Sequence, residues 1–81
     1  MLTDRYDMIT ALEANTNVQA IRFSVNGPER RGTFLGLTTQ DGYRYAKVQY
    51  RAFQKFAKPG NQWQTFNDLV FLADITGVEV K

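Results

Sequence analysis

Cysteine and histidine are absent from the 81-residue chain, and serine occurs once, as Ser24. Without cysteine there is no disulfide and no thiolate nucleophile, and without histidine the commonest metal ligand and proton shuttle is missing. Catalysis would have to depend mainly on Asp, Glu, Lys or Tyr. The late carboxylates Asp68, Asp74 and Glu79 are too widely spaced along the sequence to indicate a catalytic pair. We therefore expect a protein that is not an enzyme and that needs no metal or cofactor.

Long hydrophobic runs are also missing. No stretch approaches the roughly 18 apolar residues that a membrane span needs, and the start Met1-Leu2-Thr3-Asp4 is too polar and acidic for a signal peptide. A chain of 81 residues has room for one folded unit. We expect a single domain over residues 1–81, located in the cytoplasm and without a membrane partner.

The chain does have a basic and aromatic middle. Residues 22–58 hold eight Lys or Arg against two acids, a net charge of +6, whereas the segments before and after are each −2. The same stretch holds seven of the eleven aromatic residues. Cations interleaved with flat rings are typical of surfaces that bind a polyanion with stacking bases.

Apolar periodicity predicts one helix followed by short strands. The helix covers about residues 3–14, capped by Thr3 or Asp4, with Leu2, Tyr6, Ile9 and Leu12 as its apolar stripe and Met8 on the flank. Period-two alternation and turn signals place the strands at about 18–25, 31–38, 43–53, 63–66 and 69–80, with turns that include Asn67-Asp68. The predicted fold class is mainly β (α+β), and so many short strands in so few residues favour a small, strongly bent barrel.

Two glycines bear on the bend. Gly32 and Gly36 lie four residues apart in the strand 31–38, so alternation puts them on one face. Glycine inside a strand usually marks a bulge, a bend or the close approach of another backbone. We expect the strand to bend there.

The strand 43–53 has two chemically different faces. Arg44, Ala46, Val48, Tyr50 and Ala52 form the face assigned to the core, whereas Tyr43, Tyr45, Lys47, Gln49, Arg51 and Phe53 form the outer face. Tyrosine rings can stack on bases, and Lys and Arg can neutralise phosphates. The candidate binding residues are Tyr43, Tyr45, Lys47 and Arg51, with Arg30, Arg31, Lys55 and Lys58 widening the patch. Two alternatives remain open: a solvated face that guards the sheet against aggregation, and a surface for a protein partner.

Trp63 and Phe66 are interpreted as core anchors, since a tryptophan beside a short strand in so small a chain usually packs inside. An exposed Trp63 would instead be the best single candidate for a stacking platform or a partner hot spot. Arg22, opposite an apolar strand face, is expected to pair with Glu29 or Asp41.

The sequence resembles the WYL domain, an Sm-like or SH3-like small barrel of bacterial and phage regulators. The resemblance spans about residues 9–80 and rests on Gly36, on Tyr43-Arg44-Tyr45-Ala46, on Trp63-x-x-Phe66 and on Phe71-Leu72-Ala73-Asp74-Ile75. Tyr43-Arg44-Tyr45 stands in place of the Trp-Tyr-Leu tripeptide. The family's late arginines are absent, and Gln64 and Ala73 stand near the places that they would occupy. The resemblance implies a regulatory barrel that senses nucleic-acid or nucleotide-like ligands, with Tyr43, Tyr45 and Arg51 in its site.

The leading hypothesis is thus a binding module with a regulatory role that takes an anionic ligand, with single-stranded nucleic acid as the preferred candidate. The alternative is a protein-interaction module of the phage or plasmid type, an adapter or inhibitor of a host complex. Small barrels also pair through open strand edges, so a homo-oligomer is a third expectation.

Overall fold

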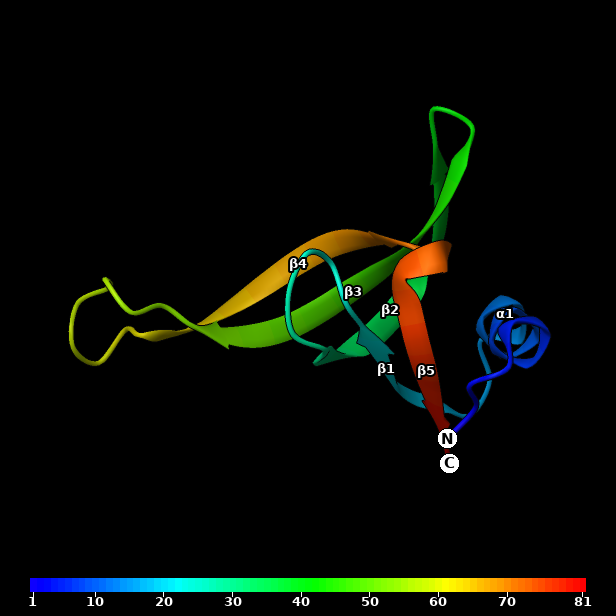
Figure 1. Ribbon diagram of the computed structural model, residues 1–81, viewed down its shortest axis with the longest axis horizontal. Coiled ribbons are helices and arrows are strands. Elements are labelled where there is room, and N and C mark those ends of the chain that lie inside the picture. Colours follow the sequence, from blue (N-terminus) through cyan, green and yellow to red (C-terminus); the bar gives the residue numbers. More distant parts are fainter.

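The structure is a computed structural model that describes all residues from 1 to 81. Its elements are α1 (Arg5–Ala14), β1 (Val18–Phe23), β2 (Arg30–Gln40), β3 (Tyr43–Phe53), β4 (Trp63–Phe71), the 3-10 turn η1 (Leu72–Asp74) and β5 (Ile75–Val80). Figure 1 shows one curved sheet with the helix to one side and the two termini close together. No helix is long and apolar enough to cross a membrane.

All five strands belong to one antiparallel sheet in the order β4-β3-β2-β1-β5. Strands β1 to β4 follow one another as neighbours, and β5 returns to pair with β1. The prediction of a mainly β fold with one amino-terminal helix is confirmed. Closure into a barrel is not observed, because β4 and β5 do not pair and each forms an edge of the sheet.

The sheet bends at Gly36. The register between β2 and β3 shifts between Phe34 and Gly36, and Gly36 has a φ of 134°, which L side chains rarely adopt. Beyond this bulge the β2–β3 hairpin and the β3–β4 hairpin diverge as two arms (Figure 1).

The bulge also corrects the expectation that the two glycines share a face. Gly36 lies opposite Lys47, on the outer side, whereas Gly32 is buried. A Cβ on Gly32 would stand 2.5 Å from Cγ1 of Val48, so Gly32 allows the two strands to approach closely over the core.

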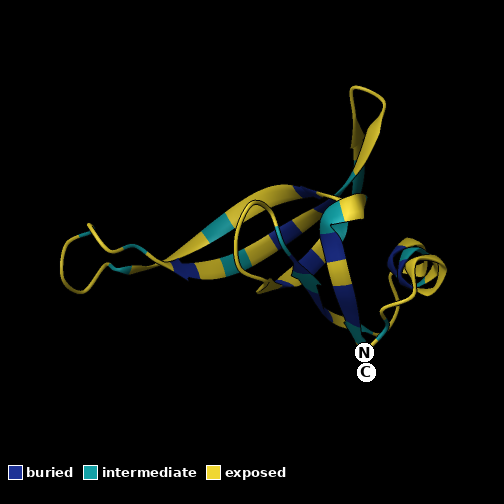
Figure 2. Ribbon diagram, viewed as in Figure 1, coloured by how far each residue is buried: buried dark blue, intermediate teal, exposed yellow.

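The core lies between the concave face of the sheet and α1. Its buried residues come from the helix and all five strands: Met8, Leu12, Ile21, Phe23, Phe34, Ala46, Val48, Val70, Ile75 and Val78. Phe23 and Phe34 are buried, and Tyr50, which was predicted on the core face of its strand, packs against this cluster. Figure 2 shows buried and exposed residues alternating along the central strands, which is the pattern of a sheet with one face in water.

The predicted helix stripe is wrong in its register. The helix begins at Arg5 with Asp4 as its cap, and Met8 and Leu12 are the residues that it buries, one turn apart. Tyr6 is 77% exposed. Leu2 lies outside the helix, bridged to Val78 of β5, so it cannot define the helical face.

Two strand boundaries also differ from the prediction. Asn67-Asp68 is no turn, because these residues pair with Gln49 and Val48 of the long strand β3 and β4 runs on through them. The predicted strand 69–80 is interrupted at η1, whose carbonyls on Leu72 and Ala73 accept hydrogen bonds from the guanidinium of Arg5.

Alternation along the sequence predicts that Val25 and Val80 point inward, but both side chains are exposed. Val25 lies beyond the end of β1, and Val80 is the last residue of β5.

Candidate nucleic-acid interface

The predicted faces of β3 are confirmed from Ala46 to Phe53, but Arg44, which was assigned to the core face, is exposed and pairs with Glu13. Ala46, Val48 and Ala52 are buried, and the intervening residues Lys47 and Arg51 are exposed. This alternation places the predicted residues Tyr43, Tyr45, Lys47 and Arg51 on one face of the strand. Because the sheet bends at Gly36, which lies opposite Lys47, these residues do not form one flat ladder.

Tyr43 directly follows the turn of the β2–β3 hairpin, Tyr45 lies two residues farther along β3, and both rings contact Phe71 of β4. The ring of Tyr45 lies 4.6 Å from that of Phe71, and the ring of Tyr43 lies 6.0 Å from it, edge-on. Tyr45 is half-buried by this contact, whereas Tyr43 stays exposed. The tyrosines therefore belong to an aromatic cluster of their own, apart from the basic residues farther along β3.

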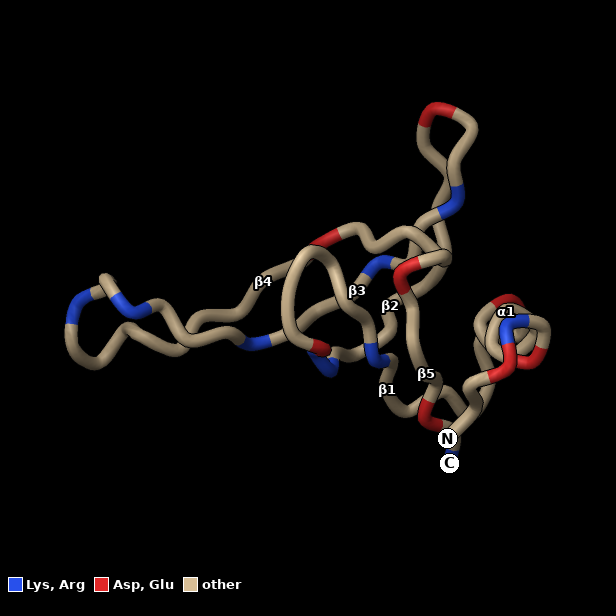
Figure 3. Tube along the Cα trace, in the orientation of Figure 1, with Lys and Arg blue, Asp and Glu red and all other residues tan.

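The basic residues gather in the other hairpin. We call residues 49–66 the β3–β4 arm; it contains Arg51, Lys55 and Lys58 and no acid, a net charge of +3. None of the three cations forms an ion pair. Figure 3 shows the basic tip of the arm away from the acidic positions of the rest of the protein, which we call the body. Their charge is available to an anion in solution.

Trp63 belongs to this arm, and the prediction that it anchors the core is wrong. It is 60% exposed and lies opposite Phe53, with the two rings 5.5 Å apart and edge-on. The guanidinium carbon of Arg51 lies 5.8 Å from the centre of the indole. The arm extends past Ala52, the last buried residue of β3, so no core lies within reach of Trp63.

The tip of the arm also has an exposed aromatic ring with a cation close to it. Phe56 is 96% exposed, and the ammonium of Lys55 lies 5.8 Å from its ring centre. Lys58 follows two residues later, before Pro59-Gly60. Exposed rings next to unpaired cations are thus found at both the side and the end of the arm.

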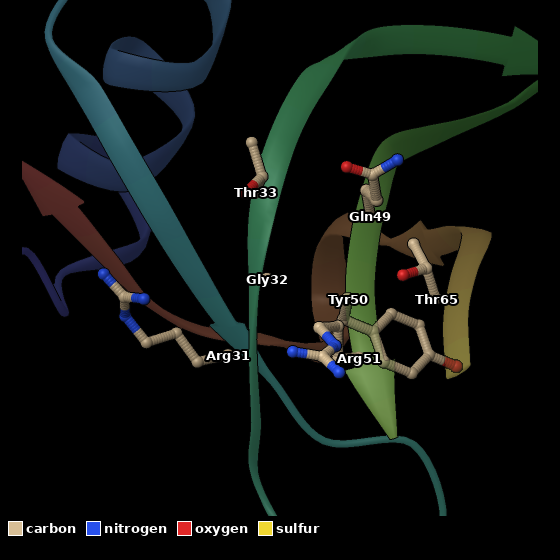
Figure 4. A pocket seen from close by; sticks show the side chains of 7 residues that line it. All are labelled: Arg31, Gly32, Thr33, Gln49, Tyr50, Arg51 and Thr65. Carbon is tan, nitrogen blue, oxygen red and sulfur yellow. The ribbon is translucent and has the colours of Figure 1, made fainter. Parts of the chain in front are cut away.

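A shallow hollow of about 380 Å³ opens on the outer face at the root of the arm. It is lined by Arg31, Gly32, Thr33, Gln49, Tyr50, Arg51 and Thr65 (Figure 4). The hydroxyl groups of Thr33 and Thr65 and the amide of Gln49 stand around it. Such a lining offers N–H and O–H groups that can donate hydrogen bonds to a phosphate group.

Arg31 and Arg30, which were predicted to widen the binding patch, both contact other residues of the protein. Arg31 donates to Glu79 at 2.7 and 3.2 Å, and in Figure 4 its side chain extends away from Arg51. The hydrogen bond between them raises the pKa of the Arg31 guanidinium and lowers the pKa of the Glu79 carboxyl. Arg22 adds contacts to Glu79 and, as expected, to Glu29, but not to Asp41. Arg31 is therefore held mainly by the body.

Arg30 lies over the ring of Tyr50, 5.5 Å from its centre. The Tyr50 hydroxyl donates to Asp68 at 2.5 Å, and this hydrogen bond raises the pKa of the phenol. The ring also contacts Phe23 and Phe66, at 5.4 and 5.7 Å. Arg30 thus borders an aromatic site on the inner side of the sheet, separate from the outer face.

Two exposed aromatics of the site, Phe53 and Phe56, were not among its predicted residues, and Trp63 was named only for the case in which it is exposed. Phe53 continues the alternation of Lys47 and Arg51, so the period-two pattern already placed it on the outer face. The pairing of Phe53 with Trp63 was the missing fact, since it shows which side of the sheet Trp63 shares.

Comparison with protein-family models, curated proteins and solved structures found no match. The interpretation therefore rests on the geometry of the chain itself.

Proposed function

We propose that this protein is a non-enzymatic module that binds single-stranded nucleic acid along the outer face of the β3–β4 arm. The observation that carries the proposal is the exposed pair Phe53 and Trp63 with Arg51 over the indole. Every base has a flat face, and stacking on an aromatic side chain contributes about 1–3 kcal/mol per base. Unpaired cations beside the rings supply the phosphate contacts.

Single strands fit this surface better than a duplex does. The bases of a duplex are already stacked on one another, whereas a single strand can turn its bases toward protein rings. Trp63 and Phe56 lie at the side and the tip of one arm, and the hollow beside Arg51 lies at its root. A single-stranded nucleic acid running along the arm would contact rings and cations at its root, its side and its tip.

The fold proposed here is a partly open barrel of the Sm-like kind. Support comes from the sheet order, the bulge at Gly36 and the single core shared by all strands. The resemblance to the WYL domain rests on the sequence pattern alone, and no ligand site is carried over from it. The regulatory role belongs to that resemblance and is a hypothesis.

The proposal is tested by titrating labelled single-stranded DNA and RNA with the protein at two salt concentrations. We expect binding at low salt that weakens markedly at higher salt, together with quenching of the fluorescence of Trp63, the chain's only tryptophan. A duplex of the same length is the control and should bind more weakly. Absence of binding at low salt would refute the proposal.

The second candidate function is a protein-interaction module, and the exposure of Trp63 favours it as well, because tryptophan and arginine are the commonest interface hot spots. A pull-down repeated after nuclease treatment distinguishes the two functions. A protein that remains bound after nuclease, and is lost with Trp63→Ala, would favour the second candidate.

A further inference from the structure

The outer edge of β4 carries a row of free backbone groups. The N–H of Gln54 donates to the carbonyl of Gln62 at 2.5 Å, and the β3–β4 register continues from this pair without a shift. Hydrogen-bonded pairs alternate along an antiparallel ladder, so the even-numbered residues of β4 bond to β3. The odd-numbered residues then direct their N–H and C=O groups to the open edge: Trp63, Thr65, Asn67, Leu69 and Phe71. No hydrogen bond to these groups comes from elsewhere in the chain.

The two edges of the sheet are protected to different degrees. On β5 the middle of the edge is covered by Leu2, whose N–H and C=O bond to Val78 at 2.8 and 2.9 Å. β4 is nine residues long, contains no proline, lysine or bulge, and nothing covers it. Proteins usually protect an edge strand with a proline, a lysine, a bulge or a covering segment, because an open strand can pair with other chains.

The side chains along this edge read almost the same in both directions. From Trp63 to Phe71 the odd-numbered residues are aromatic, threonine, asparagine, leucine and aromatic, with Asn67 at the centre. An antiparallel copy centred on Asn67 would place Trp63 opposite Phe71, and Thr65 opposite Leu69. None of the five is charged, so no like charges meet, and cross-strand aromatic pairs are stabilising.

We propose that two copies of this chain associate through β4, antiparallel and about a two-fold axis at Asn67, to form one continuous sheet. The free backbone groups of the five residues then satisfy each other across the axis. Such an interface is self-complementary and closes at two subunits. Pairing of one strand buries a small area for a specific interface, so the dimer is expected to dissociate on dilution. The proposal does not rest on nucleic-acid binding.

The register makes a sharp test possible, because Asn67 faces its own counterpart. Asn67→Lys or Asn67→Asp alone would place like charges opposite each other, whereas an equimolar mixture of the two variants would place opposite charges together. Sedimentation velocity over a range of concentrations, without nucleic acid, should show a dimer for the unmodified chain. Each variant alone should remain a monomer, and the mixture should form dimers again.

Several results would overturn the proposal: a monomer at all concentrations, assemblies larger than a dimer, variants that dimerise alone, or a mixture that stays monomeric. Circular dichroism checks that each variant is folded. As a second measurement, Asn67→Cys in this cysteine-free chain should form an intermolecular disulfide under mild oxidation. Gln40→Cys, also exposed on the sheet, is the control and should remain reduced.

Discussion

In the body of the sheet Arg22 and Arg31 share the carboxylate of Glu79, whereas in the β3–β4 arm Arg51 lies over Trp63 without an ion pair. The aromatic residues divide in the same way, since Phe23 is buried in the core and Trp63 stands in water. Composition alone gives both regions the same description, basic and aromatic. The difference shows that a binding surface is recognised by cations and rings that the fold leaves without partners.

The largest contrast concerns stability. Ile21→Ala removes a fully buried side chain from the core and should lower the free energy of unfolding by about 3 kcal/mol. Phe53→Ala in the arm should cost less than about 1 kcal/mol, because half of that side chain is already in water. Urea denaturation followed by circular dichroism measures both. Similar losses for the two variants would mean that the arm is part of the stabilising core.

For binding the contrast is reversed. Trp63→Ala should weaken binding of a single-stranded oligonucleotide by about 1–3 kcal/mol, roughly fivefold to 150-fold, with little change in stability. Trp63→Phe keeps an aromatic ring and should retain most of the affinity. Fluorescence anisotropy with a labelled oligonucleotide measures both variants. An unchanged affinity for Trp63→Ala would show that no base stacks on Trp63.

The cations of the two regions should differ in the salt dependence of binding. Arg51→Gln should reduce the slope of log K against log salt by about 0.7, the value for one phosphate contact on a single strand. Arg22→Gln, whose guanidinium is paired with Glu29 and Glu79, should leave the slope unchanged. If the two substitutions changed the salt slope equally, the nucleic acid would bind the body as well as the arm.

The smallest expected effect is a pH dependence of the body. Arg31 holds the pKa of Glu79 below its usual 4.5, so the folded state favours the ionised carboxylate. This contribution to stability is present above the unfolded-state pKa and is lost as the pH falls through the folded-state value. The urea midpoint of Glu79→Gln should therefore lie below that of the unmodified chain at neutral pH and converge with it in acid. A difference that persists in acid would contradict this role for the ion pair.

The local sequence pattern predicted most of the helices and strands. It failed where pairing with residues distant in sequence determines the conformation. The alternation of β3 gave its buried and exposed faces, because Ala46, Val48 and Ala52 are small and apolar among long polar residues. Asn67-Asp68 reads as a turn locally, but the length of β3 provides partners that keep β4 extended. The bulge at Gly36 was expected as a bend, and its effect on the face of each glycine depends on the pairing with β3.

The candidate site, like the fold, was predictable only where it follows from the pattern of a single strand. Lys47 and Arg51 followed from the period of one strand, whereas the exposure of Trp63 depends on a hairpin that extends past the core. The neutralisation of Arg31 depends on Glu79, which lies 48 residues away in sequence. Contacts of this range leave no local signal in a single sequence.

The central claim is that the β3–β4 arm, and not the body, takes up a single-stranded nucleic acid. A titration of the isotopically labelled protein with a short single-stranded oligonucleotide at low salt, followed by amide chemical shifts, tests it residue by residue. We predict shifts concentrated between Arg51 and Thr65, including the indole N–H of Trp63, with little change at Arg22 and Glu79. Shifts centred on the body, or none along the arm, would contradict the account.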